Sequence, residues 1–217
     1  MTKAASKLKI EELISRYPAL SVCRDSLNDA LDMLCESFRS GHKLMVCGNG
    51  GSAADAEHIV GELMKGFLLP RTIDEELYRR MREICPDEAD YFRENLQGAL
   101  PAVALVDQAA LNTAFANDQA ADLSFAQQVL GLGRAGDVLL AITTSGNSRN
   151  VLYAMQTAKV KGIGTIALTG RSGGRARTLA DVSVCVPEDE TYRIQEYHLP
   201  IYHMLCMALE QEFFGEE

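Results

Sequence analysis

The sequence predicts an α/β fold: a doubly wound, five-stranded parallel sheet flanked by helices, with N-terminal helices and a long C-terminal helix. Three observations support this class. Five short apolar runs recur along the chain, segments with helical spacing separate them, and 47% of the 217 residues are hydrophobic, as in a globular protein. Strands that alternate with helices form a parallel sheet because each right-handed crossover returns the chain to the same end of the sheet.

Residues 1–40 are predicted to form a helical arm ahead of the sheet. Apolar side chains recur at spacings of three and four from Leu27 to Phe38, and Gly41 follows as a stop signal. Pro18 separates this helix from a shorter one before it, because proline lacks the N–H that a helix interior needs. The arm therefore consists of two consecutive helices.

The five strands are predicted from short runs that are hydrophobic on both faces, as expected for parallel strands covered on each side. Their positions are residues 43–47, 102–106, 138–143, 164–168 and 182–186. Residues 191–214 follow as one long helix, which Pro200 is expected to interrupt. The whole chain, 1–217, is interpreted as a single domain.

Residues 68–98 depart from this alternation because charged side chains dominate them. They hold five basic and eight acidic residues, a net charge of −3. Apolar residues at helical spacing, among them Leu77, Met81 and Ile84, predict a helical insertion rather than a disordered linker. A solvated flap, a lid over the site and an oligomer contact are its possible roles.

The composition argues against a nucleic-acid partner and against a membrane protein. Thirty acidic residues outnumber 21 basic ones, giving a formal net charge of −9, and no basic run supplies a face for nucleic acid. The longest charge-free apolar run, residues 99–106, is too short to span a bilayer, and the charged start is unlike a signal peptide. We expect a cytoplasmic protein whose six scattered cysteines are reduced.

Two loops are suited to bind an anion such as phosphate. Each follows a predicted strand and leads into a helix: residues 47–52, CGNGGS, and residues 143–148, TTSGNS. Ligands of open parallel sheets bind at the carboxyl ends of strands, where glycine amides, hydroxyls and helix N-termini meet an anion. A turn that merely caps a helix is the alternative for either loop.

The first loop also satisfies the dinucleotide pattern G-x-G-x-x-G/A, from Gly48 to Ala53. A dinucleotide site needs an acidic residue about twenty positions later, at the end of the second strand. Residues 68–98 occupy that place, and the next strand ends only at Asp107. The second loop lacks the lysine of a P-loop, so neither nucleotide-binding class is favoured.

Four segments resemble the sugar isomerase (SIS) family: GNGGSAADAEH, ANDQAADLSFAQQV, GDVLLAITTSGNSRNV and RIQEYHLPIYH. Within it they are most similar to the phosphoheptose isomerases, over nearly the whole chain apart from residues 68–98. The resemblance implies the SIS fold and an aldose–ketose isomerase that converts sedoheptulose 7-phosphate to a heptose 7-phosphate through an enediol. It also implies a homotetramer with active sites near subunit boundaries.

The resemblance assigns substrate-binding roles to matching positions. Hydroxyl side chains of the second loop would hold the phosphate, namely Thr143, Thr144, Ser145 and Ser148. Residues of the first loop would line the sugar, namely Asn49, Gly50, Gly51 and Ser52. Asn117 and Asp118 match a pair that contacts substrate. Ala53 stands where phosphoheptose isomerases often have histidine, which weakens the assignment of the particular sugar.

His58 and Glu62 lie four residues apart, so they share one face of the helix that follows the first loop. A solvated surface pair is the ordinary interpretation of such a spacing. The resemblance instead implies a Zn²⁺ site made by His58, Glu62, Gln195 and His203. Glu62 would be the base that acts on carbon, His203 would be the acid/base that acts on oxygen, and Gln195 would also contact the substrate.

Helix geometry raises a difficulty for this set of ligands. Gln195 and His203 in a straight helix lie ~12 Å apart along the axis and ~80° apart around it. A bend at Pro200, or ligands from different subunits, would be needed to unite them. His198 is nearer to Gln195 and is the alternative ligand.

Two functions other than catalysis by an isomerase stay open. Some members of the family are regulators that associate with the bacterial replication initiator, keep the phosphosugar loops and lack the catalytic carboxylate. Glu62, Gln195 and His203 together favour an enzyme, whereas the SAA run at 52–54 is more typical of the regulators. The other function is that of a binding protein for an aminosugar or another sugar phosphate.

Overall fold

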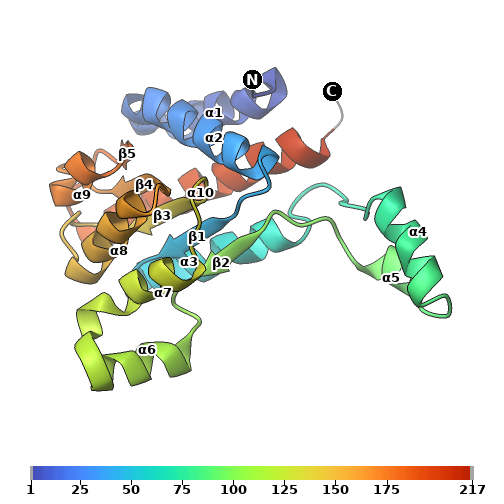
Figure 1. The fold of residues 1–217 in the computed structure, drawn as a ribbon. Helices are drawn as coiled ribbons and strands as arrows, with labels where there is room; N and C mark the ends of the chain where they lie inside the picture. Colours follow the sequence, from blue (N-terminus) through green and yellow to red (C-terminus); the bar gives the residue numbers. More distant parts are fainter. Residues whose placement is uncertain (1, 216–217) are drawn as a thin grey trace.

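The structure is a computed structural model that describes residues 2–215. Five parallel strands form one sheet in the order β2-β1-β3-β4-β5 (Figure 1). The strands are β1 (Leu44–Cys47), β2 (Ala102–Ala104), β3 (Val138–Ile142), β4 (Gly164–Thr169) and β5 (Val182–Cys185). The predicted α/β sheet is confirmed, and each strand begins and ends within two residues of its predicted limits.

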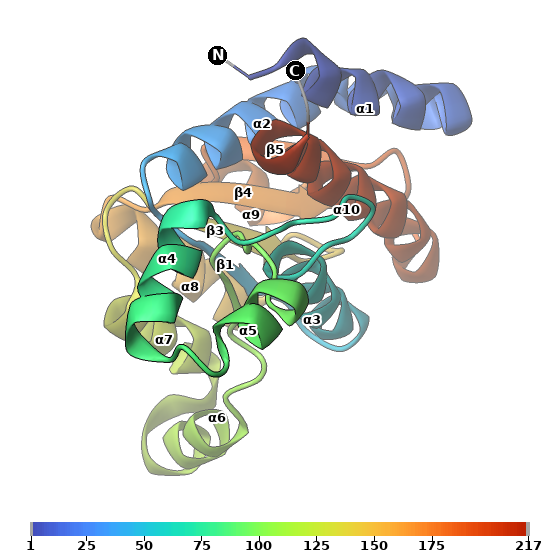
Figure 2. The same cartoon turned by 90° about the vertical axis from the view of Figure 1, so that its right-hand side faces the viewer.

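Helices cover both faces of the sheet and produce three layers (Figure 2). One face carries α1 (Ala4–Arg16), α2 (Arg24–Arg39), α3 (Gly51–Met64) and α10 (Thr191–Phe214). The other carries α7 (Ser124–Leu132), α8 (Arg149–Val160) and α9 (Gly174–Leu179). Val46 belongs to the first core and its neighbour Met45 to the second, because successive side chains of a strand point to opposite faces.

The N-terminal region contains the two predicted helices. The 3-10 helix η1 (Pro18–Cys23) joins them and begins at Pro18, the residue expected to separate them. Leu27, Leu31 and Leu34 of α2 are buried against the sheet, whereas α1 packs along α10. The apolar spacing in the sequence therefore identifies the inward face of α2 correctly.

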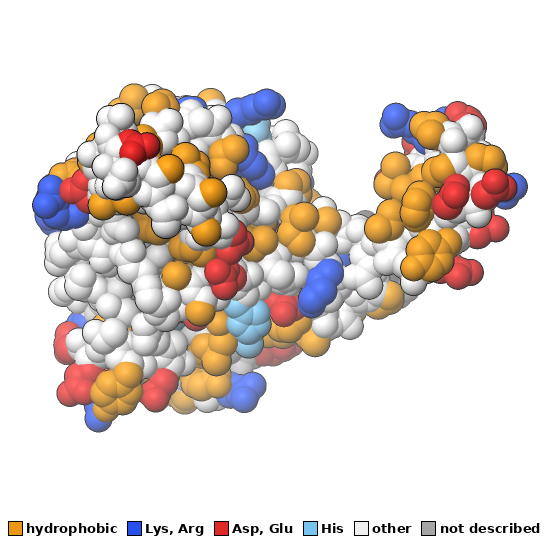
Figure 3. Space-filling view, turned by 90° about the horizontal axis from the view of Figure 1, so that it is seen from below, with side chains coloured by type: hydrophobic (Ala, Val, Ile, Leu, Met, Phe, Trp, Pro, Cys, Tyr) orange, Lys and Arg blue, Asp and Glu red, His pale blue; other side chains and the backbone are white. Residues whose placement is uncertain are grey.

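Residues 68–98 form an arm that stands apart from the three layers (Figures 1 and 3). It contains α4 (Glu75–Ile84) and α5 (Ala89–Asn95), and an antiparallel bridge between Thr72 and Gln97 closes its root. No residue of α4 is buried. Ile84 of α4 and Tyr91 of α5 are exposed, whereas Ile73 and Ala89 are buried, so part of the apolar surface of the arm faces solvent.

A second excursion follows β2 and contains α6 (Ala109–Phe115), the π-helix η2 (Ala116–Ala120) and the 3-10 helix η3 (Ala121–Leu123). An ion pair at 2.8 Å between Asp122 of η3 and Arg149 of α8 joins it to the body near the second loop.

The C-terminal helix is long, as predicted, but Pro200 does not interrupt it. α10 continues as one α-helix from Thr191 to Phe214. Proline frees the carbonyl of Glu196, and this residue is exposed, so water can satisfy the missing bond.

Across residues 2–215 no helix is long and apolar enough to cross a membrane. All six cysteines lie in that range, and none of them forms a disulfide.

Candidate active site

The sheet topology places the two predicted loops side by side. β1 and β3 are adjacent, although β2 lies between them in the sequence, so the winding of the chain reverses at this point. Asn49 of the first loop and Asn150 of α8 exchange two amide hydrogen bonds, of 2.9 and 2.8 Å. Such a switch point is where doubly wound sheets bind their ligands.

The second loop is a compact turn with hydroxyl groups ahead of the N-terminus of α8. Thr143 Oγ1 and Ser148 Oγ lie 3.1 Å apart, and Thr144 and Ser145 lie between them in the sequence. Gly146 has φ of +67°, and a Cβ there would collide with the carbonyl of the following βα loop. Hydroxyls and backbone amides at a helix N-terminus suit a phosphate without any charged side chain.

The first loop turns into α3 at Gly50, whose φ of +58° is a left-handed conformation that favours glycine. A Cβ on Gly51 would lie 2.5 Å from Nε2 of Gln195, so the side-chain amide of Gln195, from α10, lies directly against this loop. Ser52 is buried, with 3% of its surface exposed. The loop therefore presents Asn49, backbone amides and the Gln195 amide, rather than the Ser52 side chain.

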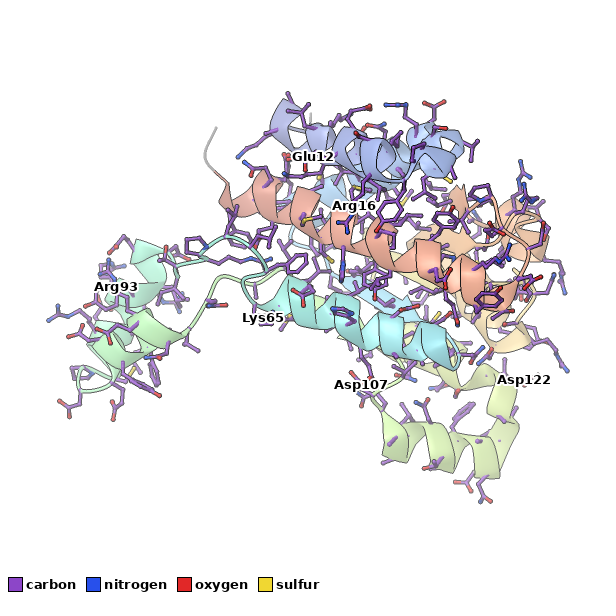
Figure 4. The ribbon with its side chains drawn as sticks, turned by 180° about the vertical axis from the view of Figure 1, so that it is seen from behind. Glu12, Arg16, Lys65, Arg93, Asp107 and Asp122 are labelled. Atoms are coloured by element: carbon purple, nitrogen blue, oxygen red, sulfur yellow. The ribbon has the colours of Figure 1, made fainter. Side chains whose placement is uncertain are left out.

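α3 and α10 run side by side in the same direction, which builds the rest of the site (Figure 4). Gln195 lies beside Gly51 at the start of α3, and His203 lies beside His58 two turns further along. The two Nε2 atoms of His58 and His203 are 3.4 Å apart. Glu62 Oε1 lies 3.6 Å from His58 Nε2, so a carboxylate and two imidazoles gather on neighbouring helices.

Glu62 contacts Lys65 through its side chain and Arg71 through its backbone carbonyl. Its side chain is 13% exposed, and Lys65 Nζ, at the exposed end of α3, lies 3.4 Å from its Oε2. The carbonyl of Glu62 accepts a hydrogen bond of 3.1 Å from Arg71 Nη2. Arg71 in turn forms a fully buried ion pair with Glu210 of α10, so the end of α3 is tied to the helix that carries His203.

Burial and the neighbouring His58 ring lower the pKa of His203, while Glu62 opposes that change. His203 is therefore neutral near pH 7, with one nitrogen that donates a proton and one that accepts. A carboxylate beside a neutral imidazole is the pair that proton transfer between adjacent carbon and oxygen atoms requires.

Three of the four predicted zinc ligands, His58, Glu62 and His203, lie close together, and the fourth, Gln195, lies beside Gly51 at the start of α3. In residues 2–215 no three His, Cys, Asp or Glu side chains form a complete metal site as they stand. The donors nevertheless fit zinc in kind, and two nitrogens bound to tetrahedral zinc at ~2.0–2.1 Å lie roughly 3.3–3.4 Å apart. His58 and His203 have that separation, and Glu62 would have to turn its carboxylate toward them.

The remaining predicted residues lie elsewhere. Asn117 and Asp118 are exposed on η2, where the Asn117 amide donates to Asp118 at 2.8 Å, and neither contacts a loop of the site within the described chain. His198 is fully buried, its pKa falls to about 4 through burial, and its ring does not reach the site. Asp107, the residue considered for a dinucleotide site, lies beside Glu57 of α3 and raises the pKa of Glu57.

Sequence reasoning missed two residues that support the site, Tyr202 and Asp55. The Tyr202 hydroxyl lies 3.1 Å from His58 Nδ1. Burial and the Asp55 carboxylate raise the pKa of Tyr202, so its hydroxyl keeps its proton. Asp55 precedes His58 by three residues, a helical spacing that could have revealed the pair, but Tyr202 gave no signal because its place depends on how α10 packs on α3.

Comparisons with a family model and with known proteins identify the same family. The model of the SIS domain matches residues 10–95 and 92–170. The phosphoheptose isomerase of Nitratiruptor sp. is 44% identical over 179 residues, which cover 82% of this chain and 81% of the relative. That of Pelobacter propionicus is 38% identical over 215 residues, covering 99% of this chain and 97% of the relative.

Solved structures of phosphoheptose isomerases are similar to this chain in both sequence and fold. The phosphoheptose isomerase from Neisseria gonorrhoeae is 33% identical with a TM-score of 0.73, covering 93% of this chain and 94% of that protein. The phosphoheptose isomerase from Francisella tularensis is 32% identical with a TM-score of 0.74, again covering 93% and 94%.

Proposed function

The chain belongs to the SIS domain family and groups with its phosphoheptose isomerases, and from that premise we propose that it interconverts sedoheptulose 7-phosphate and a heptose 7-phosphate. The observation that carries this proposal is the convergence of Glu62 and His203 on His58, on the helix that follows one of two loops suited to bind an anion at the β1/β3 switch point. An isomerase of sugar phosphates needs both an acid/base pair and a loop that holds the phosphate.

The phosphate would be held by the second loop. Thr143, Thr144, Ser145 and Ser148 offer hydroxyls, and the N-terminus of α8 offers backbone amides and the positive end of its dipole. Asn49, Gly50, Gly51 and Gln195 would contact the sugar chain between the phosphate and the reacting carbons. To contact the substrate, Asn117 and Asp118 would have to be supplied by a neighbouring subunit, or residues 109–123 would have to move toward the site.

Proton transfer between C1 and C2 would be carried out by Glu62 and His203. In the ketose-to-aldose direction, Glu62 takes a proton from C1 while His203 donates a proton to the carbonyl oxygen on C2, which gives the enediol. The hydroxyl on C1 then returns a proton to His203, and Glu62 delivers its proton to C2, which gives the aldehyde at C1. Both residues end in their starting protonation states, so the cycle balances.

Zn²⁺ would be held by His58, Glu62 and His203, with Gln195 as the fourth candidate. When bound, the ion would supply positive charge that stabilises the enediolate oxygens. The separation of the His58 and His203 nitrogens and the donor set support this assignment. Loss of turnover with a chelator and its return with zinc is the result expected.

We also propose that copies of the chain associate, as a homotetramer. A groove of about 490 Å³ between α1 and α10 supports association. Apolar side chains such as Leu199, Met204 and Met207 line it together with His203 and the charged side chains Lys9, Glu12, Arg16 and Glu196. The exposed apolar side chains of the arm support it further. A monomer in size-exclusion chromatography with light scattering would contradict the tetramer.

The test of function is turnover of sedoheptulose 7-phosphate by purified protein, with product identified by mass and chromatography. Glu62→Gln should lower kcat by about 10²- to 10⁴-fold, the usual contribution of a general base. Glu36→Gln, at an exposed carboxylate of α2, is the control and should leave turnover unchanged. Near-normal turnover by Glu62→Gln would overturn the assignment of the base. Absence of turnover in the wild type, together with binding of a replication initiator, would favour a regulator.

A further inference from the structure

Tyr202 of α10 stands between two polar groups of α3. Its side chain is nearly buried, with 2% of its surface exposed, and its hydroxyl lies 3.1 Å from His58 Nδ1. Asp55 lies one turn before His58, and its charge helps to raise the pKa of Tyr202. No hydrogen bond joins these two side chains in the part of the chain that the structure describes, and Oδ2 of Asp55 is buried without a partner there.

The direction of the hydrogen bond between Tyr202 and His58 follows from the number of protons available. An ionised carboxylate only accepts, and a tyrosine hydroxyl has one proton to give. Oδ2 of Asp55 is buried and has no hydrogen-bond partner among the described residues, so turning the Tyr202 O–H toward this carboxylate would satisfy a buried acceptor. Tyr202 Oη is then left as an acceptor, so the proton between Tyr202 and His58 belongs to His58 Nδ1.

We propose that Tyr202 is a positioning residue that connects Asp55 to His58 and fixes the His58 imidazole with its proton on Nδ1. Nε2 then faces Glu62 and His203 with the ring orientation set. A hydrogen bond from the distal nitrogen to an oxygen is the general means by which proteins orient an imidazole for its work. Only the kinetic part of this inference rests on the proposed function.

The ring of Tyr202 also packs edge-on against its neighbours, at 5.4 Å from the His58 ring and 5.0 Å from the His203 ring. A substitution that removes the ring would therefore disturb packing as well as hydrogen bonding. Tyr202→Phe keeps the ring and removes only the hydroxyl. Tyr197→Phe is the matched control, because Tyr197 lies on the same helix and its hydroxyl makes no hydrogen bond within residues 2–215.

The first test needs no turnover. Long-range ¹H–¹⁵N NMR of histidine-labelled, metal-free protein at pH 8, assigned with His58→Gln, reports which nitrogen of His58 carries the proton. We expect Nδ1–H in the wild type and in Tyr197→Phe, and a shift toward Nε2–H in Tyr202→Phe and Asp55→Asn. Nε2–H in the wild type, or an unchanged Nδ1–H in Tyr202→Phe, would overturn the proposal.

The second test measures the consequence for binding and catalysis. Tyr202→Phe should weaken zinc binding, measured by competition with a chromophoric chelator, by about 10- to 100-fold. It should lower kcat by a similar factor and leave KM within about twofold, because the phosphate loop is untouched. Unchanged zinc affinity together with unchanged kcat would show that the hydroxyl only fills space. If no sugar phosphate turns over even in the wild type, the proposed function fails while the NMR and zinc results still decide the role of Tyr202.

Discussion

Removing the carboxylate of Glu210 is predicted to destabilise the protein more than any single surface change. Glu210 lies on α10 and its side chain is fully buried, as is that of its partner Arg71, 2.8 Å away. Its two oxygens also accept hydrogen bonds of 2.7 to 3.0 Å from the backbone N–H groups of Phe67, Leu68 and Leu69. One carboxylate therefore neutralises a buried cation and satisfies three consecutive amides at the root of the arm.

The magnitude follows from what the substitution leaves behind. Glu210→Ala leaves the Arg71 guanidinium buried without a counter-charge, and loss of one partner of a buried pair costs about 3–5 kcal/mol. Three amides also lose their acceptor, which places the loss toward the upper end of that range. With an m-value of about 3 kcal/mol/M in urea, the midpoint of unfolding should fall by about 1–1.7 M.

Urea unfolding followed by circular dichroism, at one protein concentration and pH 7, measures this loss. Glu210→Gln keeps an oxygen for the amides and removes the charge, so it should lie between the wild type and Glu210→Ala. Glu83→Ala is the control, because its ion pair with Arg79 is exposed on the arm and is worth about 0.3–0.5 kcal/mol.

A loss below about 1 kcal/mol for Glu210→Ala would refute this account of the buried pair. It would mean that residues 67–71 open to water without unfolding the body. Turnover distinguishes this outcome further, because Arg71 also holds the carbonyl of Glu62 at the end of α3. A local opening would lower turnover while leaving the midpoint of unfolding in place.

Three other predictions follow from single features of the structure. Backbone hydrogen bonds and Arg71 outweigh burial and lower the pKa of Glu210 in the folded state below its ordinary 4.5. The stabilisation by its carboxylate is therefore present above pH 4.5 and is lost as the pH falls through the lower folded value. Unfolding measured at pH 7 and pH 3 should show a smaller stability difference between the wild type and Glu210→Gln at the lower pH. Gly146→Ala should weaken phosphosugar binding measured by calorimetry at least tenfold, whereas Gly131→Ala, in open space on α7, should leave it unchanged. Replacing residues 74–95 by a short glycine-rich turn should keep the far-ultraviolet spectrum of a folded body and its thermal midpoint within a few degrees, because α4 buries nothing and the Thr72–Gln97 bridge already joins the ends.

The sheet could be predicted from the sequence because its signal is local. Met45 and Val46 are both buried although they point to opposite faces, so each strand reads as an apolar run. The two loops were found for the same reason, since a loop at the end of a parallel strand has a known place in the sheet. The effect of Pro200 was predicted wrongly: α10 stays helical through it, and the exposed position of Glu196 lets water bond to the carbonyl that the proline leaves free.

The geometry of the site depended on packing that no local pattern contains. His58 and Glu62 could be paired from their spacing on α3, but their relation to His203 follows from α10 lying parallel to α3. That alignment places Gln195 against Gly51 and His203 against His58, although α10 runs through Pro200 as one helix. Tyr202 became visible only through the same alignment.

A net charge of −9 would oppose an anionic substrate if the charge lay near the loops, but its distribution weakens that effect. The arm carries −3 of the total and continues from the far end of α3, beyond Lys65 (Figure 4). The 14 residues of α3 separate that end from the first loop by about 21 Å, more than two Debye lengths of about 8 Å at physiological salt. The second loop has no ionisable side chain, and its hydroxyls, amides and helix dipole act within hydrogen-bonding distance. Binding of a phosphate there should therefore weaken only modestly as salt is raised, whereas a site built on lysine and arginine would lose most of its affinity.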